Sequence, residues 1–115
     1  MAPPYMKIVE MAKFSMFAVM TAKPEYRDKI SEIMRSPEGV AVGKNANGNL
    51  HFDICQDSEN PNIFRACELW NTKEDWEEFM QLRDESGGLV AVHGIDFAWL
   101  AEPPAFYPGV SLGVM

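Results

Sequence analysis

The 115-residue sequence is poor in basic residues and has no long hydrophobic run. Its 10 Lys and Arg are scattered and stand against 17 Asp and Glu, which gives a net charge of −7. Because nucleic-acid binding needs clustered Lys and Arg, we expect no nucleic-acid partner. No apolar stretch approaches the ~18 residues of a membrane helix, so we expect no membrane association. Prolines interrupt the N-terminal residues where a secretion signal would be apolar, so a cytoplasmic protein is expected.

Histidine and cysteine are also scarce, with two of each. His51 and His93 have no ligand spacing with each other or with Cys55 and Cys67, so the sequence predicts no metal site. The hairpin proposed below separates the two cysteines by about 13 Å along the ladder, which exceeds the reach of a disulfide. We therefore interpret both as small buried hydrophobic residues. A phosphate-binding glycine loop is missing too, and no cofactor is expected.

What the sequence does contain is enough apolar surface for one globular unit. Hydrophobic residues make up 47% and aromatic residues 11% of the chain. A chain of this length buries about two-thirds of its unfolded surface and needs no disulfide or metal to fold. We expect a single domain over residues 1–115, with a core at about 13–102, an N-terminal extension and an apolar C-terminal tail.

Hydrophobic periodicity predicts the order strand, helix, strand, strand, helix, strand. The expected strands are 13–22, 49–55, 63–70 and 95–102, and the expected helices are 24–35 and 71–85. Residues 40–49, rich in Gly and Asn, are predicted to form a loop. The order is typical of an α+β, ferredoxin-like split βαβ fold, a four-stranded antiparallel sheet with both helices on one face.

The second face of such a sheet would be left uncovered. The residues expected there include four apolar side chains, Phe17, Val19, Leu69 and Ala98. Stacking two sheets face to face covers such a surface, so the pattern predicts a homodimer.

One charged residue interrupts an apolar face of the strand at 63–70. Phe64, Ala66, Glu68 and Trp70 alternate along it, and Glu68 alone is polar. A hairpin with the preceding strand tests this pattern, since the pairing decides which residues share a face. We expect these opposite pairs: Ile54 with Phe64, Phe52 with Ala66, Leu50 with Glu68, Asp53 with Arg65, and His51 with Cys67. Glu68 would then be the only charge on that face of the hairpin.

Two stretches resemble the antibiotic biosynthesis monooxygenase family of the dimeric α+β barrel superfamily. The first is DSENPNIFRACELWNTKEDWEEF at 57–79, a polar turn, a strand of the form F-x-x-x-E-x-W and an acidic helix start; the second is AVMTAKPEYRDKISEIMRSPEG at 18–39. The resemblance implies a homodimer with pockets between sheet and helices. Some members oxidise phenols or quinols with molecular oxygen and no cofactor, whereas relatives degrade haem, cyclise polyketides or have no known activity.

The sequence departs from that family at several positions. Related oxygenases often carry histidines where this chain has Phe79 and Met80. The first strand also lacks the asparagine that haem-degrading relatives use, so haem is not expected.

Cofactor-free oxygenation requires a base, a dry pocket and a polar group that stabilises reduced oxygen. Glu68 is the candidate base, because desolvation raises the pKa of a carboxyl group toward neutrality. Trp70 could stack on a flat substrate or donate its indole N–H, and His93 could reach the mouth of the pocket. The candidate substrate-binding residues are aromatic or soft side chains: Tyr26, Phe52, Phe64, Trp76, Phe79, Met80 and Trp99.

Two readings of function remain open. The first is a cofactor-independent monooxygenase acting on a small quinol, phenol or polyketide-like substrate with molecular oxygen. The second is a non-oxidative member, either a cyclase or a ligand-binding protein. Glu68 itself has a structural alternative, in which it lies at the rim and pairs with Arg83 or Lys73. His51, pointing away from Glu68, is interpreted as structural, and His93 alternatively as solvated.

Overall fold

A four-stranded antiparallel sheet in the order β2-β3-β1-β4 organises the computed structural model, which describes residues 13–86 and 95–112. The strands are β1 (Phe14–Thr21), β2 (Asn49–Gln56), β3 (Ile63–Trp70) and β4 (Ala105–Val110). The α-helices are α2 (Arg27–Arg35), α3 (Pro37–Lys44) and α4 (Lys73–Ser86), and the short 3-10 helices are η1 (Pro24–Tyr26) and η2 (Phe97–Trp99).

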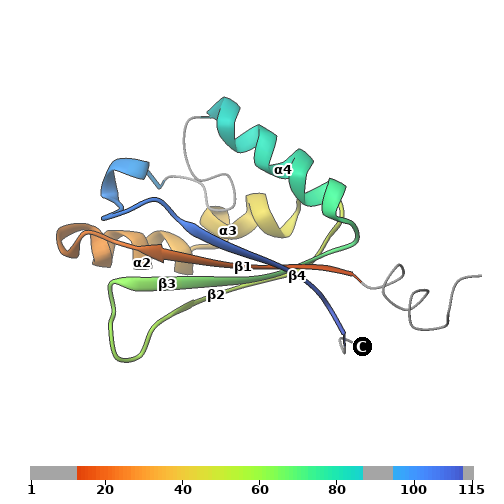
Figure 1. Cartoon of the computed structure of the whole chain (residues 1–115). Coiled ribbons are helices and arrows are strands. Elements are labelled where there is room, and N and C mark those ends of the chain that lie inside the picture. Colours follow the sequence, from red (N-terminus) through yellow and green to blue (C-terminus); the bar gives the residue numbers. More distant parts are fainter. Residues whose placement is uncertain (1–12, 87–94, 113–115) are drawn as a thin grey trace, which may run out of the picture.

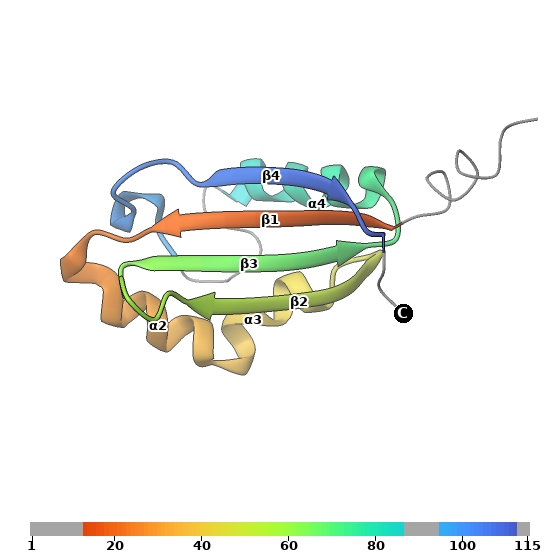
Figure 2. The same cartoon turned by 60° about the horizontal axis from the view of Figure 1, so that its bottom comes forward.

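All three α-helices lie on one face of the sheet, as Figure 1 shows. In the view of Figure 2, α4 lies behind β4 and β1, while α2 and α3 run alongside β2 at the other edge of the sheet. We call the helix-covered side the inner face and the opposite side the outer face. This arrangement confirms the ferredoxin-like α+β prediction. Among the described residues no helix is long and apolar enough to cross a membrane.

Buried side chains on the inner face form two clusters. The larger cluster joins the sheet to α2, η2 and the segment before it: Met20, Ala22, Ile30, Met34, Phe64, Ile95 and Leu100. The smaller cluster pairs Trp70 with Phe79, and Phe14, Ala46, Trp76 and Met80 pack against it. The helix predicted at 24–35 thus packs on the sheet, with Ile30 and Met34 of α2 buried.

The prediction of a loop over 40–49 was wrong for residues 40–44, which belong to α3. The helix begins at a cap: the Ser36 hydroxyl accepts the N–H of Gly39 at 3.0 Å and donates to the Ile33 carbonyl at 2.7 Å. Pro37 then occupies the first helical position, where its missing N–H costs nothing. Cap and proline outweigh the glycines that suggested a loop.

The prediction of a last strand at 95–102 was also wrong. The Asp96 carboxylate accepts the N–H of Ala98 at 2.8 Å, and this cap starts η2. Only Leu100 forms a bridge there, with Ala22. Strand β4 is instead built from the segment expected to be a packing tail, and it pairs with β1. Its Pro108 is tolerated because β4 lies at an edge of the sheet.

The β2–β3 hairpin forms with a register two residues away from the expected one. Phe52 pairs with Glu68, Ile54 with Ala66, Cys55 with Arg65 and Asp53 with Cys67. The expected Asp53–Arg65 pair is therefore absent, and Arg65 binds Asp57 at 2.9 Å instead. Because the offset is even, each residue keeps its predicted face.

The two cysteines also differ from expectation. Cys67 pairs with Asp53, one step diagonal from the Cys55–Arg65 pair, so the thiols are closer along the ladder than the expected four residues. Both are free and exposed on the outer face rather than buried.

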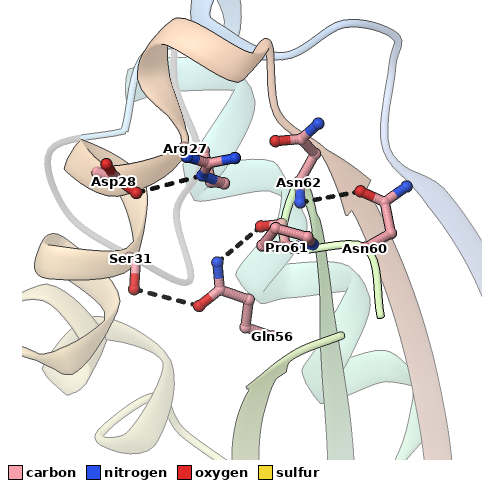
Figure 3. A network of polar contacts seen from close by, with 7 residues as sticks. All are labelled: Arg27, Asp28, Ser31, Gln56, Asn60, Pro61 and Asn62. Carbon is pink, nitrogen blue, oxygen red and sulfur yellow. Dashed lines mark hydrogen bonds and ion pairs between the residues drawn. The ribbon is translucent and has the colours of Figure 1, made fainter. Parts of the chain in front are cut away.

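Polar contacts fix the turn between β2 and β3, and Figure 3 shows part of them. The Asp57 carboxylate accepts the backbone N–H groups of Glu59 and Asn60 at 3.0 and 2.7 Å. Gln56 donates to the Pro61 carbonyl at 2.6 Å and accepts from the Ser31 hydroxyl of α2 at 3.4 Å. The turn is thus tied both to itself and to the helix layer, and these contacts select the observed register.

We predict that Ser36→Ala destabilises the protein by about 1 kcal/mol, because the first turn of α3 loses its cap. Urea unfolding followed by circular dichroism measures this change. Ser58 is an exposed serine in the β2–β3 turn, and Ser58→Ala is the matched control. Its free energy of unfolding should stay within about 0.5 kcal/mol of the parent value. Equal stability of the two variants would contradict a capping role for Ser36.

Candidate active site

Glu68 lies at the centre of the inner face, surrounded by apolar side chains. Its neighbours across the sheet are Met16 on β1 and Phe52 on β2, and its neighbours along the face of β3 are Ala66 and Trp70. All four are buried, and Glu68 itself is 7% exposed, the buried charged residue in a core otherwise made of apolar side chains. The prediction that this residue is the one charge on an apolar face is correct for the described sheet.

The alternative in which Glu68 lies at the rim does not match this geometry. Lys73, one of its two suggested partners, forms an ion pair with Glu77 at 3.7 Å on the exposed side of α4. The side chain of the other, Arg83, lies outside the described residues.

Burial raises the pKa of Glu68 from 4.5 to about 7, because the ionised carboxylate loses its water. The indole N–H of Trp70 donates to Oε1 of Glu68 at 3.0 Å and lowers the pKa, but by less. Near neutral pH the group is therefore divided between acid and carboxylate. Such a group can accept a proton and return it within one catalytic cycle.

Trp70 is held rigidly by aromatic packing. It is completely buried, and its ring centroid lies 5.1 Å from that of Phe79 on α4. Phe14 packs against the same cluster, and its ring centroid lies 5.6 Å from that of Trp76. The indole N–H therefore points at Glu68. The ring is covered by protein side chains and is not open to stack on a ligand.

The predicted substrate-binding residues divide between two places. Four lie near Glu68 or its partner Trp70: Phe52 beside Glu68 in the sheet, and Trp76, Phe79 and Met80 in the Trp70 cluster. The other three, Tyr26, Phe64 and Trp99, belong to the larger cluster.

Within the larger cluster Tyr26 stacks on Trp99 at 5.5 Å between ring centroids. Lys29 lies 4.6 Å above the Trp99 ring. Trp99 stands in η2 and not on a strand as expected. We therefore assign this group to the core and restrict the candidate site to the surroundings of Glu68 and Trp70.

His51, the histidine among the described residues, does not belong to the site. His51 is exposed on the outer face opposite Leu69, pointing away from Glu68 as predicted. His93 lies outside the described residues. Within the described ranges no three His, Cys, Asp or Glu side chains gather where they could hold a metal ion.

Sequence reasoning missed Met16 and Phe14 as members of the site. Met16 faces Glu68 directly across β1–β3, and Phe14 faces Trp70. Alternation along β1 put both on one face, but only the β1–β3 register reveals which partners they meet.

Comparison with known proteins agrees with this architecture. The model of the antibiotic biosynthesis monooxygenase family matches residues 14–84, more than half of the chain. The chain belongs to this family. No curated protein matches it by sequence. The family match covers β1 through most of α4 and so includes both Glu68 and Trp70.

Solved structures share the fold of this antibiotic biosynthesis monooxygenase family member at low identity. A putative antibiotic biosynthesis monooxygenase from Nitrosomonas europaea superposes with a TM-score of 0.65 at 20% identity, covering 87% of this chain and 99% of that one. The protein PA3566 from Pseudomonas aeruginosa gives 0.66 at 20% identity, with 89% and 96% covered. A protein of unknown function from Nitrosomonas europaea gives 0.68 at 13% identity, with 91% and 94% covered.

The raised pKa of Glu68 makes a prediction about stability. Between pH 4.5 and about 7 the folded chain holds a proton that the unfolded chain has released, so this group's stabilisation is complete below pH 4.5 and is lost as the pH rises through about 7. The loss amounts to about 3 kcal/mol. Glu68→Gln keeps a neutral acceptor for the Trp70 N–H and should remove this dependence.

Urea unfolding at pH 5 and pH 8 measures the effect. Glu68→Gln should lie close to the parent at pH 5 and be more stable than the parent at pH 8. Glu74→Gln, which replaces an exposed carboxylate on α4, is the control and should follow the parent. A parent and a Glu68→Gln variant with parallel pH profiles would show that the carboxyl group is not desolvated.

Proposed function

We propose that the chain is a cofactor-independent monooxygenase that oxidises a small aromatic substrate, a quinol, phenol or polyketide-like compound, with molecular oxygen. One observation carries the proposal: a buried carboxyl group with a pKa of about 7 stands on an apolar, aromatic face and is held by a single indole N–H. Membership of the antibiotic biosynthesis monooxygenase family supports the reaction class.

In the proposed reaction the Glu68 carboxylate removes a proton from an activated C–H or O–H group of the substrate. The resulting carbanion or phenolate passes one electron to molecular oxygen, and the radical pair combines to a carbon-bound peroxide anion. Glu68, now protonated, returns its proton to give the hydroperoxide. Loss of water from a CH–OOH group leaves a carbonyl, so CH2 and O2 become C=O and H2O.

The surroundings of Glu68 favour each of these steps. Met16, Phe52 and Ala66 keep water away from the carboxylate, which strengthens it as a base. The Trp70 N–H stabilises the ionised form enough for it to exist at neutral pH. Because a nearby anion would raise the pKa further, a neutral substrate suits this base better than a charged one.

A second candidate function is non-oxidative, either polyketide-like cyclisation or ligand binding without turnover. The observation that favours it is the buried contact between Phe79 and Trp70, which fills a position where related oxygenases often carry a histidine. A cyclisation would use Glu68 as acid and base without consuming oxygen.

Oxygen consumption separates the two functions. With a panel of hydroquinones and anthrones, we expect at least one compound to be oxidised with oxygen uptake. Glu68→Gln should lower this rate by about 10²-fold or more, since general-base catalysis contributes about that factor. Glu74→Gln should retain the parent rate. Aromatic ligands that bind with no oxygen uptake would overturn the oxidative proposal, and an unchanged rate in Glu68→Gln would remove Glu68 from the mechanism.

We also propose that the protein acts as a homodimer in which the outer faces of two sheets meet. Phe17 and Tyr107 are 37% and 57% exposed on that face, and their ring centroids lie 6.1 Å apart. The pair forms an aromatic patch on neighbouring strands β1 and β4. Contact between this patch and the same patch of a second copy would remove both patches from water.

Light scattering coupled to size-exclusion chromatography tests this assembly. The parent should elute with the mass of two chains, and Phe17→Glu should shift it toward one chain. Val42→Glu introduces the same charge at an exposed apolar position on α3 and should leave the dimer intact. A monomeric parent would refute the proposed assembly.

A further inference from the structure

A pocket of about 280 Å³ lies between the α2–α3 corner and strand β2. Its volume is close to the lower limit of small-molecule sites, which begin at about 300 Å³. Strand β2 is an edge strand of the described sheet, in which no further strand pairs with its outer edge. The lining residues belong to α2, α3, the residue between them and β2, whereas α4 lies behind β4 and β1, toward the other edge of the sheet (Figure 2).

Apolar side chains form the floor of this pocket. Met34 comes from α2, Val40 from α3, and Phe52 and Ile54 from the inner face of β2. Met34 and Phe52 belong to the buried core, and the other two are half-buried. Such a floor would contact a short hydrocarbon or aromatic body.

Two cations stand over this floor. Arg35 is the last residue of α2 and Lys44 is the last residue of α3, and both line the pocket. Within the part of the chain that the structure describes, neither forms a salt bridge, whereas Arg27, Arg65 and Lys73 do. Two such cations at one small pocket are notable in a chain of net charge −7.

Both cations also favour the carboxyl ends of their helices, where positive charge complements the helix dipole. That role explains why each residue is basic. It does not explain why both residues line one pocket, because cations that point away from each other would interact equally well with the two helix dipoles.

We propose that this pocket binds a small organic carboxylate, with its apolar body on the Met34–Val40–Phe52–Ile54 floor and its carboxylate between Arg35 and Lys44. A guanidinium group provides paired N–H donors that match a carboxylate, and an ammonium group adds a point charge.

Asp53 allows a second test of whether the pocket prefers negative charge. It also lines the pocket, and it alternates along β2 with the floor residues, which puts it on the exposed outer face. Because its side chain lies on the face opposite the floor, its negative charge opposes an anion in the pocket only weakly, through solvent. Asp53→Asn should therefore leave carboxylate binding unchanged or strengthen it, whereas loss of either cation should weaken it.

The pocket is distinct from the candidate active site. Glu68 is not among its lining residues, although the pocket and the candidate site share Phe52, which pairs with Glu68 in the sheet. Binding here does not depend on the proposed oxygenation, so Glu68→Gln should bind the same carboxylate as the parent.

The test is an NMR titration of the ¹⁵N-labelled full chain with hexanoate and with its neutral counterpart hexanamide. Hexanoate should give saturable shifts at residues 34–44 and 52–54, and hexanamide should bind about ten-fold more weakly. Arg35→Gln and Lys44→Gln should each weaken hexanoate binding about three-fold, and the double variant about ten-fold, as expected for exposed ion pairs. Both residues are exposed, so the variants should remain folded.

Lys29→Gln is the matched control: it removes one positive charge from α2 outside the pocket and should bind hexanoate like the parent. Equal affinity for hexanoate and hexanamide would show an apolar pocket without anion recognition and would overturn the proposal. Equal weakening by Lys29→Gln and Arg35→Gln would reduce the effect to net charge, and the absence of saturable shifts would show that the pocket does not bind carboxylates.

Discussion

The desolvation of Glu68 is the constraint on which the inner face depends. A shift of its pKa from 4.5 to about 7 corresponds to about 3 kcal/mol when the group is ionised. Small domains are stable by only about 5–15 kcal/mol, so one carboxylate lowers stability by a considerable fraction. A glutamine would accept the Trp70 N–H without this cost. The carboxyl group is therefore poorly explained by packing alone, which supports the proposed role in proton transfer.

The face on which Glu68 stands could be predicted from sequence, although its partners could not. Strand alternation has a period of two, so the even offset in hairpin register left Phe52 and Ile54 on the same face as Glu68. The register itself was set by the turn, where Asp57 accepts two backbone N–H groups and pairs with Arg65. An opposite-charge pair was expected within the ladder, but the available anion lay in the turn.

The two largest errors have a common physical origin. Residues 95–102 show apolar alternation, yet an aspartate cap turns the chain, and Ile95 and Leu100 enter the core from irregular structure. Residues 105–110 lack a strong strand pattern, yet they pair with β1 because that strand has a free edge. Local patterns record burial, whereas strand formation also requires a partner that only the tertiary structure provides.

Phe52 belongs to two environments of opposite electrostatic preference. On the Glu68 side, apolar neighbours and a partly ionised carboxyl group disfavour any further negative charge, since like charges in a poorly solvated region repel strongly. On the side of the α2–α3 corner, Arg35 and Lys44 favour it. A neutral phenol and an organic carboxylate would thus be directed by their charge to two different proposed sites that share Phe52. Phe52 contributes an apolar wall to both proposed sites, so the contrast in charge would be the main difference between the two proposed ligands.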